Sequence, residues 1–169
     1  YGTTGKGPRK VRLEREFHKQ LEACFLDIWS KFPLGKPDVF VSGGCYVEKA
    51  GRHGEGKAVD IDAFHWHEDS NSGGMTARSL VTRDAFKNFV TARWYLGIEA
   101  ILRQHFGTVL GFHYNSAHED HWHVDNGTPP GWREGSRARV VFLQAALVHV
   151  FGHVLDIDGI LGPKTRGAW

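Results

Sequence analysis

The sequence is poor in features that mark several large classes of protein. Its 169 residues include two cysteines and one methionine, and the net charge is +2 with histidine neutral. A charge so close to zero provides no broad basic surface that could hold nucleic acid or an anionic membrane. The longest apolar runs, 140–143 and 145–148, are far shorter than the ~20 residues that cross a bilayer. We therefore expect no nucleic-acid partner and no membrane span.

The rest of the composition is that of a globular protein, with one unusual component. Hydrophobic residues make up 41% and charged residues 24% of the chain, which is enough for a packed core. Four of the eleven histidines lie in one short stretch, at His113, His118, His121 and His123. Because histidine is a common metal ligand, this cluster indicates that a metal site should be sought.

Hydrophobic periodicity predicts an α+β fold with a small antiparallel sheet. Apolar residues recur at helical spacing in three stretches, 11–32, 82–106 and 140–151. Short strands are expected at 39–41, 58–64, 109–112 and 121–125. In the second helical stretch Thr82 is a candidate N-cap and Gly97 a candidate break. Residues 65–81 are polar and rich in glycine and serine, which favours an exposed loop.

Glycine and proline concentrate in a later stretch, which indicates a linker. The chain then divides into a domain at 1–126, a linker at 127–137 and a short helical C-terminal segment at 138–169.

Two of the expected strands carry metal-binding side chains on one face. Side chains alternate along a strand, so Asp60 and Asp62 share a face, and the other face is apolar. In the same way His121, His123 and Asp125 share one face of their strand. Each of these two strands therefore has an apolar face that would pack in the core and a polar face that carries candidate metal ligands.

A loop histidine completes the candidate set. His53 precedes Asp60 in a stretch whose glycines, at 54 and 56, allow the backbone to bend until the two side chains converge. A hydrolytic zinc site uses three nitrogen and oxygen ligands from the protein and leaves one position for water. His53, Asp60 and either His121 or His123 would meet that requirement. Singly, each is commonly a solvated side chain, but together they predict a metal site.

The two cysteines leave two alternatives open. Cys24 and Cys45 could form one disulfide in an oxidising compartment or remain two buried thiols. Neither has a neighbouring base that the sequence identifies, so we expect neither to be a nucleophile.

These motifs resemble a known group of enzymes. The Ser42-Gly43-Gly44 turn, the pattern HxxGxAxDI at 53–61 and the pattern DHxHxD at 120–125 are similar to zinc peptidases. That group shares a fold with D-alanyl-D-alanine carboxypeptidases, the murein endopeptidase and the hedgehog signalling domain. Within it, the two patterns and the two cysteines are most similar to the bacterial extensin-like proteins. The resemblance implies an α+β domain whose small antiparallel sheet carries zinc, with helices covering the other face.

The resemblance also implies roles for single residues. His53, Asp60 and His123 match the three zinc ligands, and His121 matches a companion histidine that stabilises the reacting oxygen.

Two family patterns fit the catalytic base. Asp120 matches the base of carboxypeptidase-like members, whereas His118 and His121 match the histidines of murein-endopeptidase-like members. Glu119 has no clear family role, and we expect it to be solvated.

The implied function is hydrolysis of amide bonds in the peptide cross-links of peptidoglycan, by a monomer in the periplasm or outside the cell. Many carboxypeptidase members carry an arginine just after the SG turn, where this chain has Cys45 and Tyr46. That departure favours an endopeptidase. The extensin-like resemblance further favours a disulfide between the two cysteines. The rival hypothesis is a non-catalytic zinc-containing wall-binding module, because the hedgehog branch can use this fold for recognition.

The C-terminal segment carries a second resemblance. Leu143-Gln144, followed by residues 158–162 and Thr165, is similar to the opening of a peptidoglycan-binding domain. Exposed aromatic residues would assist glycan binding, and the candidates are Trp66, Tyr114, Trp122 and Trp132.

Overall fold

The computed structural model describes residues 10–66 and 78–169. Its helices are α1 (Arg15–Lys31), α2 (Phe89–His105), α3 (Arg137–His149) and α4 (Pro163–Ala168), with short 3-10 helices η1 (Thr82–Lys87) and η2 (Ser116–His118). Its strands are β1 (Val39–Gly44), β2 (Ala58–Trp66), β3 (Arg78–Val81), β4 (Thr108–Leu110) and β5 (Trp122–Asp125). The α+β prediction is confirmed.

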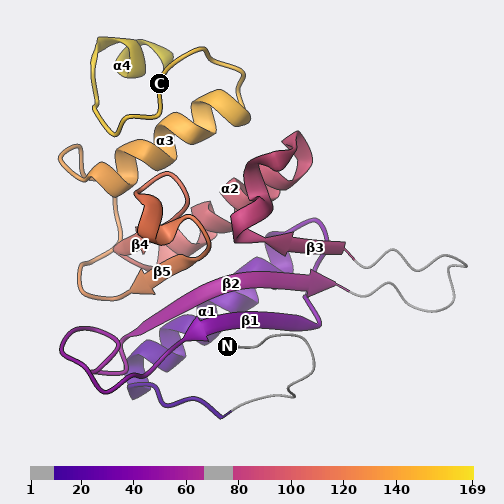
Figure 1. Ribbon diagram of the computed structural model, residues 1–169, viewed down its shortest axis with the longest axis vertical. Coiled ribbons are helices and arrows are strands. Elements are labelled where there is room, and N and C mark those ends of the chain that lie inside the picture. The colour runs from indigo at the N-terminus through magenta and orange to yellow at the C-terminus, as the bar shows by residue number, and fades with distance from the viewer. Residues whose placement is uncertain (1–9, 67–77) are drawn as a thin grey trace, which may run out of the picture.

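The strands form one antiparallel sheet built around β2 (Figure 1). Strand β1 pairs with β2 along one edge, and β5 and β3 pair with the beginning and the end of β2. Strand β4 then extends the sheet beyond β5. In this register Asp60 on β2 lies opposite His123 on β5. The pairing brings together two sequence motifs that are more than sixty residues apart.

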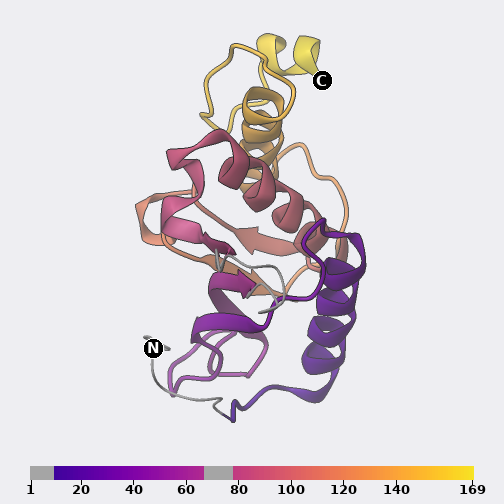
Figure 2. The same cartoon turned by 90° about the vertical axis from the view of Figure 1, so that its right-hand side faces the viewer.

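One face of the sheet is covered by helices. Helix α1 lies behind β1 and β2 in Figure 1, and Figure 2 shows it running along one side of the sheet. The buried core includes Phe17, Leu21 and Ile28 of α1, Leu96 and Leu102 of α2, Val59 and Ile61 of β2, and Trp122 and Val124 of β5. The alternation expected for β5 and for the first half of β2 therefore holds, and Asp60 and His123 lie on the face away from this core. Phe64, expected on the face of Asp60, is instead buried in the core, because the register of β2 with β1 shifts between Ile61 and Ala63.

The residues that flank α1 determine where this helix begins and ends. The Glu14 carboxylate accepts hydrogen bonds from the backbone N–H groups of Glu16 and Phe17, which caps the first turn. Phe32 is extended, as expected for a residue that precedes proline, and the helix ends there.

Two predictions about the second helix are wrong. Its N-cap is Asn88, whose side chain accepts from the N–H of Thr91, and the helix continues through Gly97 without a break. Thr82 instead begins η1, and its hydroxyl donates to the backbone carbonyls of Asp62 and Asp120. Thr82 thereby ties β2 to the segment that leads into β5.

The prediction of an exposed loop at 65–81 is also wrong in part. Strand β2 continues to Trp66, and Arg78–Val81 form β3, in which Leu80 is fully buried. Residues 67–77 of that expected loop lie outside the described residues. Trp66 and Trp122 are buried, so neither is a surface for glycan contact.

The C-terminal segment is held together by Gln144 of α3. Its amide nitrogen donates to the Asp158 carboxylate and to the Thr165 hydroxyl, and its oxygen accepts from the N–H of Gly159. The residues of the second resemblance therefore meet around one buried amide. Ala145 of the same helix belongs to the main core.

Both cysteines are free thiols in this structure. Cys24, on the buried face of α1, lies in the core, and burial raises the pKa of its thiol to about 12. Burial also raises the pKa of Cys45. The disulfide favoured by the resemblance is not formed, and the alternative of two buried thiols holds. Among the described residues, no helix is long and apolar enough to cross a membrane.

Candidate metal centre

The site is built on the cross-strand pair Asp60 and His123. Asp60 Oδ1 lies 3.0 Å from His123 Nδ1. The carbonyl oxygen of Asp60 accepts a hydrogen bond of 2.7 Å from the Ser42 hydroxyl on β1. Register shifts around Ser42 and Gly43 bring β1 close to β2, where a Cβ on Gly43 would lie 3.0 Å from Asp62 Oδ1. Ser42, Gly43 and Gly44 are thus the end of β1 rather than the predicted turn, and they pack against the strand that carries Asp60.

His53 reaches this pair from the loop between β1 and β2. A Cβ on Gly54 would lie 1.7 Å from the carbonyl oxygen of Lys49, so only glycine fits there. Gly56 has φ +69°, a left-handed conformation that favours glycine, and its carbonyl accepts from the N–H of Glu14. The loop therefore bends back as the two glycines predicted.

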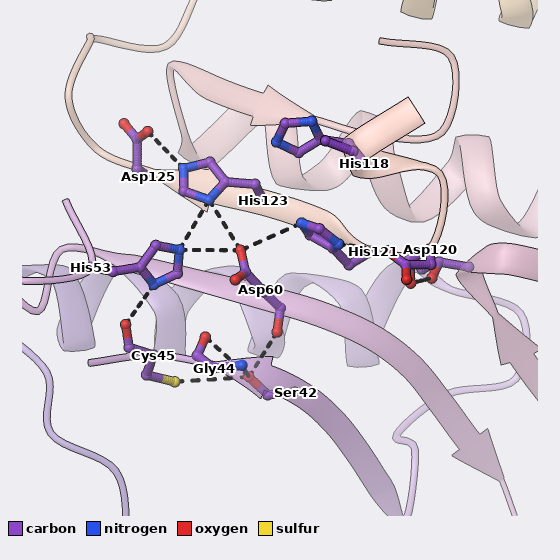
Figure 3. A network of polar contacts seen from close by, with 12 residues as sticks. Ser42, Gly44, Cys45, His53, Asp60, His118, Asp120, His121, His123 and Asp125 are labelled. Atoms are coloured by element: carbon purple, nitrogen blue, oxygen red, sulfur yellow. Dashed lines mark hydrogen bonds and ion pairs between the residues drawn. The ribbon is translucent and has the colours of Figure 1, made fainter. Parts of the chain in front are cut away.

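The three side chains converge on one point (Figure 3). His53 Nε2 lies 3.1 Å from His123 Nδ1 and 3.2 Å from Asp60 Oδ1. With the 3.0 Å contact between Asp60 and His123, these atoms form a nearly equilateral triangle. Within residues 10–66 and 78–169, this is the one group of three histidine, cysteine or acidic side chains arranged to hold a metal ion.

The outer nitrogens of both histidines are already engaged. His53 Nδ1 lies 2.6 Å from the carbonyl oxygen of Cys45, which can only accept, so this nitrogen carries the proton. His123 Nε2 lies 3.1 Å from Asp125 Oδ2 and donates to that carboxylate. Neutral rings then direct lone pairs from His53 Nε2 and His123 Nδ1 toward the Asp60 carboxylate. Three acceptors this close repel one another unless a cation lies between them, so the arrangement fits a bound metal ion.

Even without a metal, the surrounding charges favour a positive charge between His53, Asp60 and His123. Burial opposes ionisation of Asp60, but its contacts with His123 and His53 outweigh that effect and hold the pKa of Asp60 well below its usual range. Burial likewise lowers the pKa of His123, but the contacts with Asp125 and Asp60 dominate and raise it to about 9. A proton can thus occupy this position when no metal does, and metal binding must displace it.

His121 lies beside the triangle on its open side. Its Nε2 is 3.8 Å from Asp60 Oδ1, and its Nδ1 is 2.8 Å from Asp120 Oδ1. The hydrogen bond from His121 lowers the pKa of Asp120, and a contact of 2.9 Å from Arg83 adds to the effect. Asp120 is therefore an ionised acceptor that fixes the His121 ring with Nε2 toward the metal position.

The other two residues of this segment differ in their relation to the site. The His118 ring is centred 5.2 Å from His121 and 6.1 Å from His123, so it borders the open side. Burial lowers the pKa of His118, with a further contribution from His121. Glu119 is exposed, as expected.

The structure brings all six predicted site residues into one region, but they are not equivalent. His53, Asp60 and His123 form the triangle, His121 and His118 flank it, and Asp120 lies beyond His121 (Figure 3).

The sequence analysis assigned no role to three supporting groups. They are the carbonyl of Cys45, the Asp125 carboxylate and the Arg83 guanidinium. Asp125 was detectable, because it lies two residues after His123 on the same strand face. A backbone carbonyl and a distant arginine leave no comparable pattern in the sequence.

Comparison with known families supports the grouping of these motifs. The family model described as extensin-like protein C-terminus matches residues 44–134, more than half of the chain. The chain belongs to the extensin-like family. The match contains every residue of the candidate metal centre and ends before the C-terminal segment. No curated protein and no solved structure matches this extensin-like chain.

Proposed function

We propose that this extensin-like protein is a zinc-dependent peptidoglycan peptidase, an endopeptidase that hydrolyses amide bonds in the peptide cross-links of the cell wall. The proposal includes a periplasmic or secreted location. The observation that carries it is the triangle of His53, Asp60 and His123, whose remaining ring nitrogens are held by other groups.

The donor set favours zinc over the common hard cations. Two imidazole nitrogens and one carboxylate oxygen suit zinc, whereas calcium and magnesium prefer oxygen ligands. Bonds of about 2.05 Å in tetrahedral geometry separate ligand atoms by about 3.3 Å. The three separations in this site, 3.0, 3.1 and 3.2 Å, are close to that value.

When bound, zinc would supply a water of lowered pKa and polarise the scissile carbonyl. The proton of that water has a nearby acceptor in this chain. His121 donates from Nδ1 to Asp120, so its Nε2 is free to accept a proton on the metal side. The same nitrogen can return the proton to the leaving amine. In this arrangement His121 is the base and Asp120 is a positioning residue.

His118 provides a second imidazole on the open side. The exposed fractions of the Asp60 and His121 side chains are 25% and 21%, so solvent and substrate can reach this region. His118 lies next to His121 and is available to bind the reacting oxygen or to relay its proton.

The substrate class rests on three further features. The resemblance of the metal-site motifs to peptidoglycan peptidases and the resemblance of the C-terminal segment both favour the bacterial cell wall. The segment after the SG turn carries Cys45 and Tyr46 in place of an arginine that would bind a terminal carboxylate. An internal amide bond is therefore the preferred substrate.

The test is digestion of purified, cross-linked peptidoglycan by the full chain loaded with zinc, followed by mass spectrometry of the muropeptides. We expect cross-linked dimers to be converted to monomers with one new amine per bond cleaved. His123→Ala should bind no zinc and release no products, whereas His18→Ala, at an exposed histidine of α1, should leave both unchanged. Tight zinc binding without any cleavage would reject the peptidase and select a zinc-containing wall-binding module.

A further inference from the structure

Asp62 lies where the regular pairing of β2 is interrupted on both of its edges. Strand β5 pairs with residues 58–61, and β3 begins to pair only at Ala63. On the other edge, consecutive residues of β1 pair with Ile61 and Ala63, so Asp62 is the extra residue of a β-bulge. Its carbonyl oxygen accepts a hydrogen bond of 2.9 Å from the Thr82 hydroxyl. Because bulges beside active sites re-aim a side chain, the carboxylate of Asp62 is a candidate for substrate contact.

That carboxylate lies against Gly43 and beside the metal centre. A Cβ on Gly43 would lie 3.0 Å from Asp62 Oδ1 and 3.3 Å from Oδ2, and the backbone N–H of Gly43 donates to this carboxylate. The charges of Asp60, His121 and Asp120 all act on it, so it is close to a metal ligand and to the proposed base. The carboxylate is half-buried, which leaves it accessible to a bound substrate.

The other carboxylates of the site face cations, whereas Asp62 has no lysine or arginine partner among the described residues. Asp120 contacts Arg83 at 2.9 Å. Asp60 and Asp125 together would balance the two charges of a bound zinc ion. One half-buried negative charge therefore remains beside the metal centre, and a cationic group of the substrate would compensate it.

We propose that Asp62 binds an ammonium group of the substrate, so that the protein prefers peptides with a free side-chain amine next to the scissile amide. This inference deepens the proposed peptidase function and rests on it. In the cross-links of peptidoglycan a diamino acid precedes the D-alanine whose carbonyl is attacked, and its side-chain amine is free on the donor stem. That ammonium would donate charge-assisted hydrogen bonds to the carboxylate. A carboxylate of a substrate at the same place would be repelled, which agrees with an endopeptidase.

The spacing along β2 suits such a substrate. Asp62 is two residues beyond Asp60, which corresponds to about 7 Å along a strand. An extended peptide advances about 3.3 Å per residue, so the residue before the D-alanine lies at a similar distance from the carbonyl that is attacked. Its amine can then contact Asp62 while that carbonyl lies at the metal position.

The test uses two synthetic cross-linked peptides that differ only in the donor stem, where one has lysine and the other Nε-acetyl-lysine. Acetylation removes the positive charge and retains the side chain. For the zinc-loaded full chain we expect kcat/KM to be at least about tenfold higher for the lysine peptide, because a hydrogen bond between charged groups is lost in the other. Equal values for the two peptides would overturn the role of Asp62 and leave the peptidase standing.

Variants show whether the preference comes from this carboxylate. Asp62→Asn keeps the shape of the side chain and removes its charge, so the ratio of kcat/KM between the two peptides should fall to about 1. Asp62→Glu retains the charge and should keep part of the preference. Asp84→Asn, at an exposed acidic residue of η1, is the matched control and should discriminate as the parent does. A full preference in Asp62→Asn would contradict the assignment.

Binding measured without turnover separates this inference from the peptidase. Isothermal titration calorimetry follows the two donor-stem peptides, which contain no cross-link, with the zinc-loaded full chain. We expect the lysine peptide to bind about tenfold more tightly than its acetylated form to the parent, and both to bind alike to Asp62→Asn. If the parent shows this preference but cleaves no cross-link, the peptidase fails and the ammonium site stands. If the parent binds both peptides alike, the ammonium site fails, whether or not cross-links are cleaved.

Discussion

Asp60 and His123 face each other directly across neighbouring antiparallel strands, with 3.0 Å between Oδ1 and Nδ1. Their spacing follows from the register of β2 with β5, which buried side chains on the opposite face hold in place. A one-residue slip of β5 would turn His123 into the core and leave Asp60 without its partner. The site is therefore as rigid as the sheet, and only His53 depends on a loop.

The role of Asp120 can be tested by removing its carboxylate. Asp120→Ala should keep zinc, because this residue does not belong to the triangle. Turnover should fall by about 10²-fold or more, because the His121 ring loses the partner that fixes its proton on Nδ1.

Arg83→Ala is the matched control. Its side chain is 70% exposed and contacts only the far oxygen of Asp120, so we expect less than about a tenfold loss of turnover. Full activity in Asp120→Ala would contradict the orienting role.

Asp125 holds the His123 ring on the side away from the proposed metal position. Asp125→Ala removes the acceptor of His123 Nε2 and should weaken zinc binding about 10- to 100-fold, measured by competition with a chelator. Asp125→Asn retains an acceptor oxygen and should recover part of the affinity. Asp84→Ala, at an exposed acidic residue of η1, should have no effect. Equal affinities in all three variants would show that this contact does not tune the site.

The loop that carries His53 depends on Gly54. Gly54→Ala places a methyl group against the Lys49 carbonyl, so the loop must shift and zinc affinity should drop strongly. Gly97→Ala is the control, because its Cβ meets nothing within 4 Å and the position is inside α2. That variant should bind zinc normally and gain about 0.5–1 kcal/mol of stability. If Gly54→Ala binds zinc as tightly as the parent, the close contact between Gly54 and the Lys49 carbonyl is contradicted.

Stability should depend on pH through His113. This residue packs against Phe86 and His149, and its Nε2 has no partner in the described structure. Burial lowers the pKa of His113 from 6.5 to about 4, with a smaller contribution from His149. As the pH falls, this histidine takes up a proton in the unfolded chain near pH 6.5 but in the folded protein only near pH 4. The contribution of neutral His113 to stability is therefore complete above pH 6.5 and is lost as the pH falls toward about 4.

His113→Phe removes that titration. The melting temperature of the parent should fall more steeply than that of the variant between pH 6.5 and 4, and the exposed control His153→Phe should follow the parent. Parallel pH profiles for parent and His113→Phe would exclude the buried neutral histidine.

The sequence predicted the fold class and the site because both depend on alternation and local spacing. The alternation in β2 and β5 placed Asp60 and His123 on one face, and the glycines between His53 and Asp60 predicted the bend of the loop. The resemblance assigned the third ligand position to His123 rather than His121, and in the structure it is a ring nitrogen of His123 that lies close to both His53 and Asp60.

The predictions that failed depended on tertiary contacts. Thr82 looked like an N-cap, but its hydroxyl bridges two backbone carbonyls, and Asn88 caps the helix instead. Leu80 lies in a polar stretch, yet it is buried by pairing of β3 with β2. Gly97 does not break α2, because buried neighbours such as Leu96 and Ile98 hold the helix against the core.

The central claim is that His53, Asp60 and His123 hold one zinc ion. X-ray absorption spectroscopy of the zinc-loaded full chain tests it most directly, together with the metal content per chain. We predict one zinc per chain with only nitrogen and oxygen neighbours at about 2.0–2.2 Å, and loss of that signal in His53→Ala. Absence of stoichiometric zinc, or a sulfur neighbour at about 2.3 Å contributed by a cysteine, would contradict the account.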